Sequence, residues 1–366
     1  MTLKQRIEKN KIAKKTISVF AFIVFKSIRL IRKRKKNNSN ITLIISLHNI
    51  GDTVFTIPAI RLYLKHSNDK TIIICYKDSE TIYRKILDNV DYFILSNDDF
   101  YLNGRLSSGA ARNKVNKLSA DTIIDMKGSV VSASLIFSSH CNRIVGVNEE
   151  YFKGIYDSFL PVRTAPHQID IYFDAVKSLI PDYELNFNGY PVSFNNLGSI
   201  LIQPFSGWKA KEWGLNNFVL LYKKLAQSDE CTIIFSKSKI SQDNLETLKN
   251  DKIETLESNS IENLIEEILK CKLFISNDSG PLQIAALFGK PTFSIYGPTN
   301  PEYHLPIGKH HKFIYKNLRC SPKKEKYCYT DGGLYCPHYD CLKLLSVDEV
   351  YIEVKKMLSL IEDSNE

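Results

Sequence analysis

Apolar runs of four to seven residues alternate with longer stretches of helical periodicity along most of the chain. Strands are predicted over residues 41–47, 71–75, 92–95, 122–125 and 143–147, and helices over 53–65 and 172–179. The pattern then restarts, with strands predicted over 199–203, 231–235, 273–276, 292–295 and 312–315, and helices over 216–227, 260–269 and 347–361. Strands that alternate with helices indicate parallel sheets covered by helices on both faces.

A polar, turn-rich passage over residues 181–198 separates the two series and is the expected interdomain linker. The 366 residues suffice for two domains of ordinary size. We therefore predict an α/β protein with two Rossmann-like domains, over residues 41–190 and 191–345, whose parallel sheets face a central cleft. A C-terminal helix and tail follow over residues 346–366.

Residues 1–40 form a basic arm, with 13 Lys or Arg against a single acidic residue. The formal net charge of the chain is +9, and the arm carries +12 of it, which leaves −3 for the body. A body so close to neutral argues against a broad nucleic-acid surface and against nucleic acid as a partner.

The arm contains an uncharged stretch, Ile17–Phe25, in which apolar residues recur at helical spacing. A membrane-spanning helix needs about 20 apolar residues, so this stretch is too short. No small-residue cleavage site follows it, which argues against a secretory signal. We expect an amphipathic helix that holds residues 1–36 on an anionic membrane surface, on the inner face of the cytoplasmic membrane. The alternatives are a solvated tail and a helix packed on the body.

The eight cysteines fall into two groups. Cys75, Cys141, Cys231 and Cys271 lie in or beside strand-like segments, where we expect buried, reduced thiols. The second group, with His338 among its members, consists of Cys320, Cys328, Cys336 and Cys341. Their spacing does not match the usual paired zinc pattern, so a metal site is possible there but is not favoured.

The turn after the first predicted strand brings together His48, Asn49, Gly51 and Asp52. In open α/β sheets ligands bind beyond the carboxyl ends of the strands, so Asp52 would point into the cleft. Simple N-capping of the following helix is the alternative. The turn is not a dinucleotide fingerprint, because Gly51 lacks further glycines at the required spacing.

A second turn, after the predicted strand 199–203, contains Ser206, Gly207 and Lys211. A lysine in this loop could neutralise a diphosphate leaving group as a point charge, and an exposed loop lysine is the alternative.

The third turn follows the predicted strand 273–276. Asn277 and Asp278 suit the turn and the N-cap, Gly280 allows a ligand to approach the backbone, and Pro281 fits the first helical turn. Free N–H groups at the start of such a helix form a ready phosphate site.

These turns belong to a series of motifs that runs in order from about residue 41 to 355. The motifs are Gly51-Asp52 with Pro58, Lys211-Glu212-Trp213, Asp278-Ser279-Gly280-Pro281, Gly289-Lys290-Pro291 and Gly297-Pro298-Thr299. In this order they resemble the heptosyltransferase family, glycosyltransferase family 9, whose members transfer heptose to the lipopolysaccharide core. The resemblance implies a GT-B fold, with the acceptor on the N-terminal domain and the nucleotide-sugar on the C-terminal domain.

The resemblance also implies roles for individual residues. Asp52 would be the general base and Lys211 would hold the departing phosphates, while His48, Asn49 and Gly51 would form the acceptor-side loop. Donor binding would fall to Ser206, Gly207, Lys211, Asp278, Ser279, Gly280, Pro281 and Gln283. The reaction would invert the anomeric configuration and need no metal or other cofactor. The partners implied are ADP-heptose and a lipid-linked saccharide.

Three departures from the family pattern affect the donor. Gln283 stands where the family often has histidine, Ser279 replaces a threonine, and the loop 236–243 lacks the usual glycine. The sugar is therefore heptose or another hexose-like unit, and the base adenine or uracil. The other functions open to this chain are nucleotide-sugar epimerase and nucleotide-sugar-binding scaffold without transferase activity.

Overall fold

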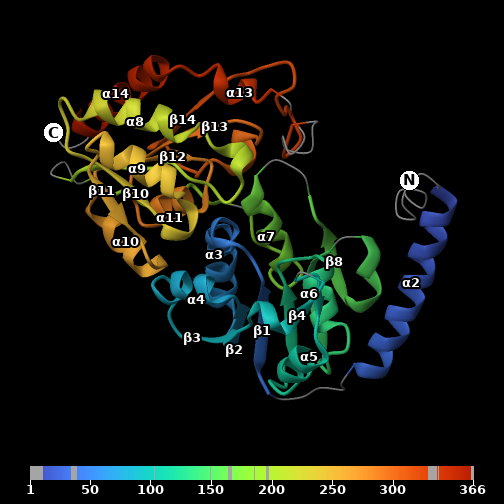
Figure 1. Cartoon of the computed structure of the whole chain (residues 1–366). Coiled ribbons are helices and arrows are strands. Elements are labelled where there is room, and N and C mark those ends of the chain that lie inside the picture. The colour runs from blue at the N-terminus through green and yellow to red at the C-terminus, as the bar shows by residue number, and fades with distance from the viewer. Residues whose placement is uncertain are drawn as a thin grey trace. The chain divides into compact units, whose positions relative to one another are not determined.

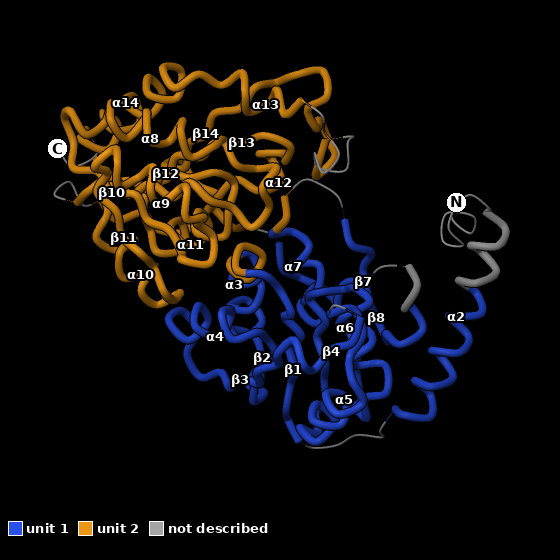
Figure 2. The backbone as a smooth tube through the Cα atoms, in the orientation of Figure 1, with its two compact units in different colours: residues 1–49, 55–163, 169–185 blue, residues 50–54, 164–168, 186–366 orange. Residues whose placement is uncertain are grey.

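The structure, a computed structural model, describes residues 11–33, 39–102, 104–148, 150–163, 167–184, 186–194, 198–328, 336 and 338–363. The chain divides into two compact units (Figure 2). The first contains residues 1–49, 55–163 and 169–185, and the second contains residues 50–54, 164–168 and 186–366. The described residues 11–33 of the basic arm thus cluster with the first unit, and the C-terminal helix with the second.

The first unit holds a parallel six-stranded sheet in the order β3-β2-β1-β6-β7-β8. Figure 1 labels β1, β2, β3 and β8 of this sheet. Its strands are β1 Ile41–Ser46, β2 Lys70–Cys75, β3 Val90–Ile94, β6 Thr122–Asp125, β7 Arg143–Asn148 and β8 Ser158–Pro161, with a small hairpin of β4 Phe100–Tyr101 and β5 Leu106–Ser107. Its helices are α2 Lys11–Arg32, α3 Ile50–His66, α4 Lys77–Arg84, α5 Gly109–Asn116, α6 Val130–Ile136 and α7 Gln168–Val176, with short 3₁₀ turns η1 Asn97–Asp99 and η2 Glu150–Ile155. The first turn of α3 clusters with the second unit.

The second unit repeats this topology in a sheet of order β11-β10-β9-β12-β13-β14. Its strands are β9 Ile200–Gln203, β10 Cys231–Phe235, β11 Thr255–Glu257, β12 Leu273–Asn277, β13 Thr292–Tyr296 and β14 His311–Tyr315. Its helices are α8 Leu215–Leu225, α9 Gln242–Asn250, α10 Ile261–Lys270, α11 Gly280–Leu287, α12 Pro301–His304, α13 Asp340–Lys343 and α14 Val347–Asp363, with η3 Lys209–Lys211 and η4 Lys237–Lys239.

In both sheets the strand order reverses beside the first strand, between β1 and β6 and between β9 and β12. Ligands of doubly wound sheets bind at the carboxyl ends of the strands at this switch point. Ser276 in β12 lies beside Gln203 in β9, so the turns that follow these two strands begin next to each other. The fold therefore places the second and third motif turns at one edge of one sheet.

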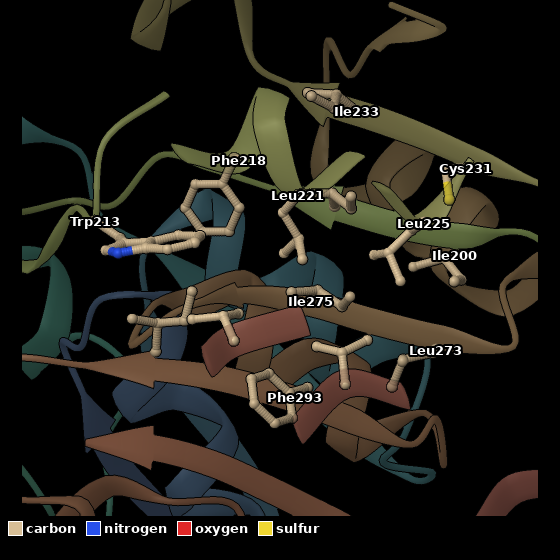
Figure 3. Close-up of a cluster of buried hydrophobic side chains, with 14 of the residues drawn as sticks. Ile200, Trp213, Phe218, Leu221, Leu225, Cys231, Ile233, Leu273, Ile275 and Phe293 are labelled. Carbon is tan, nitrogen blue, oxygen red and sulfur yellow. The ribbon is translucent and has the colours of Figure 1, made fainter. Parts of the chain in front are cut away.

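The core of the second unit is formed by one face of its sheet and by α8 (Figure 3). The Trp213 ring lies edge-on to Phe218, with the ring centroids 5.2 Å apart, and its Nε1 donates to the Leu345 carbonyl at 3.0 Å. Helix α14 completes this core with Val350, Val354, Met357, Leu358 and Ile361. The C-terminal helix is thus an integral part of the unit that carries β9 and β12.

Helix α2 packs against η2 of the first unit. A Cβ on Gly154 would lie 2.5 Å from the Phe22 carbonyl oxygen, so glycine is required for this close approach. Arg29 is buried, and its guanidinium contacts the Asp157 carboxylate and donates to the Cys141 and Asn142 carbonyls, both at 3.0 Å. Of the alternatives for the arm, the helix packed on the body is what the structure shows for residues 22–29. In the part of the chain that the structure describes, no helix is both long and apolar enough to cross a bilayer.

All ten predicted strands are present, with ends displaced by at most two residues. The helix predicted over 172–179 is in fact α7, which begins at Gln168 and ends at Val176. The sequence analysis missed the edge strands β8 and β11, the hairpin of β4 and β5, and helices α4, α5, α6, α9, α12 and α13. Cys75, Cys141, Cys231 and Cys271 are buried free thiols, as predicted.

Candidate functional site

The turn between β12 and α11 differs in one respect from the prediction. The N-cap is Ser279, whose side chain accepts from the Leu282 N–H, and Pro281 lies in the first helical turn as expected. Asn277 and Asp278 were the predicted caps, but Asn277 ends β12 and both side chains point to other partners. A polar residue at the N-cap satisfies one free N–H group and leaves the helix dipole directed at the turn.

The Asp278 side chain is buried and ion-paired. Its Oδ2 lies 2.7 Å from Lys211 Nζ and accepts from Thr299 Oγ1 at 2.8 Å. Burial alone would raise the pKa of this carboxyl, but the charge of Lys211 and both hydrogen bonds hold the pKa below its usual range. Asp278 is therefore a carboxylate at neutral pH, and the pair that it forms with Lys211 has no net charge.

Asn277 links the two turns at the switch point. Its Nδ2 donates to the Pro204 carbonyl at 2.7 Å, and its Oδ1 accepts from the Trp213 N–H at 3.0 Å. Both partners lie in the loop after β9 that carries Lys211. Because the two bonds cross from β12 to the two ends of this loop, Asn277 fixes the position from which Lys211 reaches Asp278.

The same loop contains the predicted donor-binding residues Ser206 and Gly207. The Ser206 N–H donates to Glu212 Oε1 at 3.0 Å, and its hydroxyl donates to the Asp278 carbonyl at 3.3 Å. A Cβ on Gly207 would meet no atom within 4 Å, so open space rather than packing surrounds this glycine. The structure therefore brings Ser206, Lys211 and Asp278 together around one point.

Several buried polar atoms near Asp278 have no hydrogen-bond partner among the described residues. They are His304 Nδ1, the Tyr296 hydroxyl and, in β9, Gln203 Oε1. Burial, and then the Asp278 charge, raise the pKa of Tyr296. Gln283 Nε2 donates to the His304 carbonyl at 2.8 Å. These atoms are free to accept from or donate to a polar ligand bound in the turn.

His304 is neutral at physiological pH. Burial is the main cause that lowers its pKa from 6.5 to about 4; Asp278 opposes this shift, whereas Lys326 and Lys211 add to it. No sequence signal pointed to His304, which follows the recognised Gly297-Pro298-Thr299 motif. The ring can therefore accept or donate a hydrogen bond in the site without adding a positive charge.

This pKa predicts acid sensitivity. Between pH 6.5 and 4 the unfolded chain binds a proton at residue 304 that the folded chain does not, so stability is lost as the pH falls through this window. The shift corresponds to about 3 kcal/mol of unfolding free energy. His304→Phe, which keeps an aromatic ring, should reduce the loss of stability between pH 6.5 and 4 in denaturant titrations. His66→Gln, a change at an exposed histidine, should leave it unaltered, and equal slopes for all three proteins would contradict the assignment.

Asp52 lies in the first turn of α3, three residues after the N-cap, Asn49. N-capping, the alternative role for Asp52, is therefore wrong. Within the second unit, to which residues 50–54 belong, a Cβ on Gly280 would lie 3.1 Å from Ile50 Cγ2. The absence of a side chain at Gly280 thus leaves room for the Ile50 side chain. After burial, the charge of Asp52 raises the pKa of Tyr327. For His304, burial lowers the pKa, and the charge of Asp52 opposes this shift as the smallest of its causes.

His48 is a buried residue of the same turn. Its ring lies edge-on to Tyr172 with the centroids 5.1 Å apart, and its carbonyl accepts from the Ser79 hydroxyl at 3.2 Å. The packing indicates that His48 supports the turn that carries Gly51 and Asp52.

The four cysteines of the C-terminal segment are free thiols. Burial, followed by the charges of Cys320, Cys328 and Cys336, raises the pKa of Cys341 to about 11. Among the described residues, no group of three or more His, Cys, Asp or Glu side chains is arranged to hold a metal ion.

Comparison with known proteins identifies the family. Residues 109–332 match the family model described as glycosyltransferase family 9 (heptosyltransferase). Lipooligosaccharide heptosyltransferase 2 of Campylobacter jejuni is 29% identical over 191 residues, which span 50% of this chain and 58% of that protein. The chain thus matches little more than half the length of this relative.

Two solved structures share the fold. The family 9 glycosyl transferase of Veillonella parvula has a TM-score of 0.70 and 14% identity, covering 89% of this chain and 99% of that one. The E. coli heptosyltransferase WaaC with ADP has a TM-score of 0.64 and 16% identity, covering 87% and 99%. The match to the family model, over more than half of the residues, together with this common α/β GT-B fold, places the chain in glycosyltransferase family 9, the heptosyltransferase family.

Proposed function

We propose that the chain transfers heptose from ADP-heptose to a lipopolysaccharide core or a related lipid-linked saccharide. The carrying observation is the arrangement of Lys211, Asp278 and the α11 N-terminus at the switch point of the second sheet. The family match and the names of the relatives, a lipooligosaccharide heptosyltransferase and a heptosyltransferase solved with ADP, support this choice of donor and acceptor.

In the proposed reaction the acceptor hydroxyl oxygen attacks the anomeric carbon, and the bond from that carbon to the diphosphate oxygen breaks. Asp52 takes the proton of the hydroxyl, for which it must come within hydrogen-bond reach of that oxygen. The electron pair of the broken bond leaves with ADP. A single displacement of this kind inverts the anomeric configuration and needs one base and no covalent intermediate.

The departing diphosphate is proposed to lie at the N-terminus of α11. Its free N–H groups and the Lys211 ammonium would stabilise the negative charge that develops on the leaving oxygen. Ser206, Gly207, Ser279 and Gln283 line or support the same turn pair. On this proposal the charge stabilisation comes from the protein itself, so activity should persist after dialysis against a chelator.

A panel of nucleotide-sugars tests the donor. Thermal unfolding of the whole chain with ADP-heptose, ADP-glucose, UDP-glucose and UDP-N-acetylglucosamine should show a selective rise with ADP-heptose. Transfer to a truncated lipopolysaccharide acceptor, with the product anomer read by NMR, then tests the reaction. A donor that binds without transfer would favour the scaffold, and conversion of the donor without acceptor would favour the epimerase.

We further propose that helix α2 lies on the anionic inner face of the cytoplasmic membrane, with the lipid-linked acceptor. Phe25 and Arg29 face the first unit, whereas the opposite side of the helix exposes Phe20, Ile23 and Leu30 at spacings of three to seven residues. Further exposed apolar residues on the helix are Val19, Phe22, Val24 and Ile31. With many Lys and Arg in the same arm, this surface fits an interfacial helix on anionic lipid.

Charge placed on the outward side should release the protein from membranes. The double variant Ile23→Glu with Leu30→Glu removes two exposed apolar contacts, so binding to vesicles that contain anionic phospholipid should fall at least tenfold in sedimentation assays. Leu220→Glu, at an exposed leucine on α8, is the matched control and should bind like the parent protein. Deletion of residues 1–36 should give the same loss, and a truncated chain that still sediments would contradict the proposal.

A further inference from the structure

The segment 325–328 belongs to the cysteine-containing part of the chain. Hydrogen bonds to residues 299 and 300 hold this segment near Asp278. The Asn300 N–H donates to the Lys326 carbonyl at 3.0 Å, and the Asn300 side chain donates to the Glu325 carbonyl at 3.1 Å. Thr299 and Tyr327 form an antiparallel bridge. Because the Thr299 hydroxyl also donates to Asp278, this pairing carries Lys326 and Tyr327 to the edge of the donor site.

The Lys326 side chain is half-buried on an aromatic surface. Its Nζ lies 5.2 Å from the centroid of the Tyr303 ring and 5.5 Å from that of Tyr327, and it donates to Gln168 Oε1 at 3.0 Å. Tyr327 also stacks on His304 and lies edge-on to Trp208, above which Lys211 Nζ is placed at 5.8 Å. The two lysines therefore contact one continuous group of aromatic rings.

The charges already at this site are too few for a diphosphate. Lys211 is paired with Asp278, so the pair contributes no net charge. His304 is neutral at physiological pH, because burial above all lowers its pKa to about 4. The N-terminus of α11 supplies only about half a positive charge. A nucleotide-sugar carries a negative charge on each of its two phosphates, so a further cation is needed.

We propose that Lys326 is a second phosphate-binding residue, which acts with Lys211 and the α11 N-terminus on the diphosphate of the donor. This inference rests on the proposed function, because it requires a nucleotide diphosphate in the second unit. The rings of Tyr303 and Tyr327 would hold the lysine stem and leave the ammonium directed by electrostatics to the phosphates.

Binding of ADP, AMP and adenosine to the whole chain tests the proposal, with UDP and GDP included to cover a different base. Lys326→Met keeps the apolar stem and removes the charge. It should weaken ADP binding about tenfold or more, weaken AMP binding less, and leave adenosine binding unchanged, because a charge-assisted hydrogen bond to phosphate is lost. Lys326→Arg should restore most of the ADP affinity. Lys324→Met, at an exposed lysine two residues away, should bind like the parent protein.

Each other outcome has a definite meaning. Equal ADP affinity for Lys326→Met and the parent protein would overturn the proposal while leaving the proposed function intact. An equal loss for ADP and adenosine would also overturn it, because it would show that Lys326 only supports the aromatic rings. If the parent protein prefers none of the three diphosphates to AMP, the proposed function fails, and this inference fails with it.

Discussion

Asp52→Asn should reduce the turnover of sugar transfer by about 10²- to 10⁴-fold and change the affinity for the donor by less than about twofold. The amide occupies the same volume as the carboxylate but cannot take a proton from the acceptor hydroxyl. On the proposed function, donor binding depends instead on Lys211 and on the turns after β9 and β12. Turnover measured as ADP release, together with donor affinity from calorimetry, separates the two effects.

Asp78→Asn is the matched control for this prediction. Asp78 lies in the first turn of α4, the helix of the next βα unit, and its side chain is exposed. Its loss should leave both turnover and affinity unchanged. If Asp52→Asn lowered donor affinity as much as turnover, Asp52 would be a binding residue and the proposed base would have to be sought elsewhere.

The sequence predicted the parallel sheets well because their strands are continuous buried runs. Ile41–Ser46 and Leu273–Asn277 are buried along almost their whole length, so the apolar run and the strand coincide. Some of the missed elements have weaker patterns. Helix α9, for example, buries only Leu248, and the edge strand β11 is half exposed or exposed throughout. A helix or edge strand with one buried side chain leaves little periodicity to recognise.

The sequence predicted individual residues of the site but not the contacts between them. The motifs that contain Lys211, Asp278 and Thr299 lie in separate segments of the sequence. The structure joins these residues through two side-chain contacts. The N-cap at Ser279 did not follow from the pattern, because several polar residues in a row can each cap a helix. The ion pair did not follow either, because its two partners lie in separate segments. His304 ends the short helix α12 and Lys326 lies in the segment 325–328. Ring stacking and backbone pairing bring them to the site, and these leave no periodic signal in a sequence.

Lys211→Met should have two separable effects, because Lys211 is proposed to serve both the fold and the donor. Removing one partner of a buried ion pair leaves Asp278 as an uncompensated carboxylate, so we expect a loss of about 3–5 kcal/mol in unfolding free energy. Donor affinity should also fall about 10- to 100-fold, through the lost charge-assisted hydrogen bond to phosphate. Lys209→Met, at an exposed lysine two residues before, should change neither quantity.

The double variant Lys211→Met with Asp278→Asn distinguishes the two effects. The neutral amide can still accept from Thr299 and has no charge to compensate, so most of the lost stability should return in denaturant titrations. Donor affinity should not return, because the ammonium that is proposed to bind phosphate is still missing. If both recovered together, Lys211 would act only by keeping Asp278 in place, and the phosphate role would pass to other cations. If the single variant were as stable as the parent protein, Asp278 would tolerate burial by taking up a proton, and its pKa in that variant would rise accordingly.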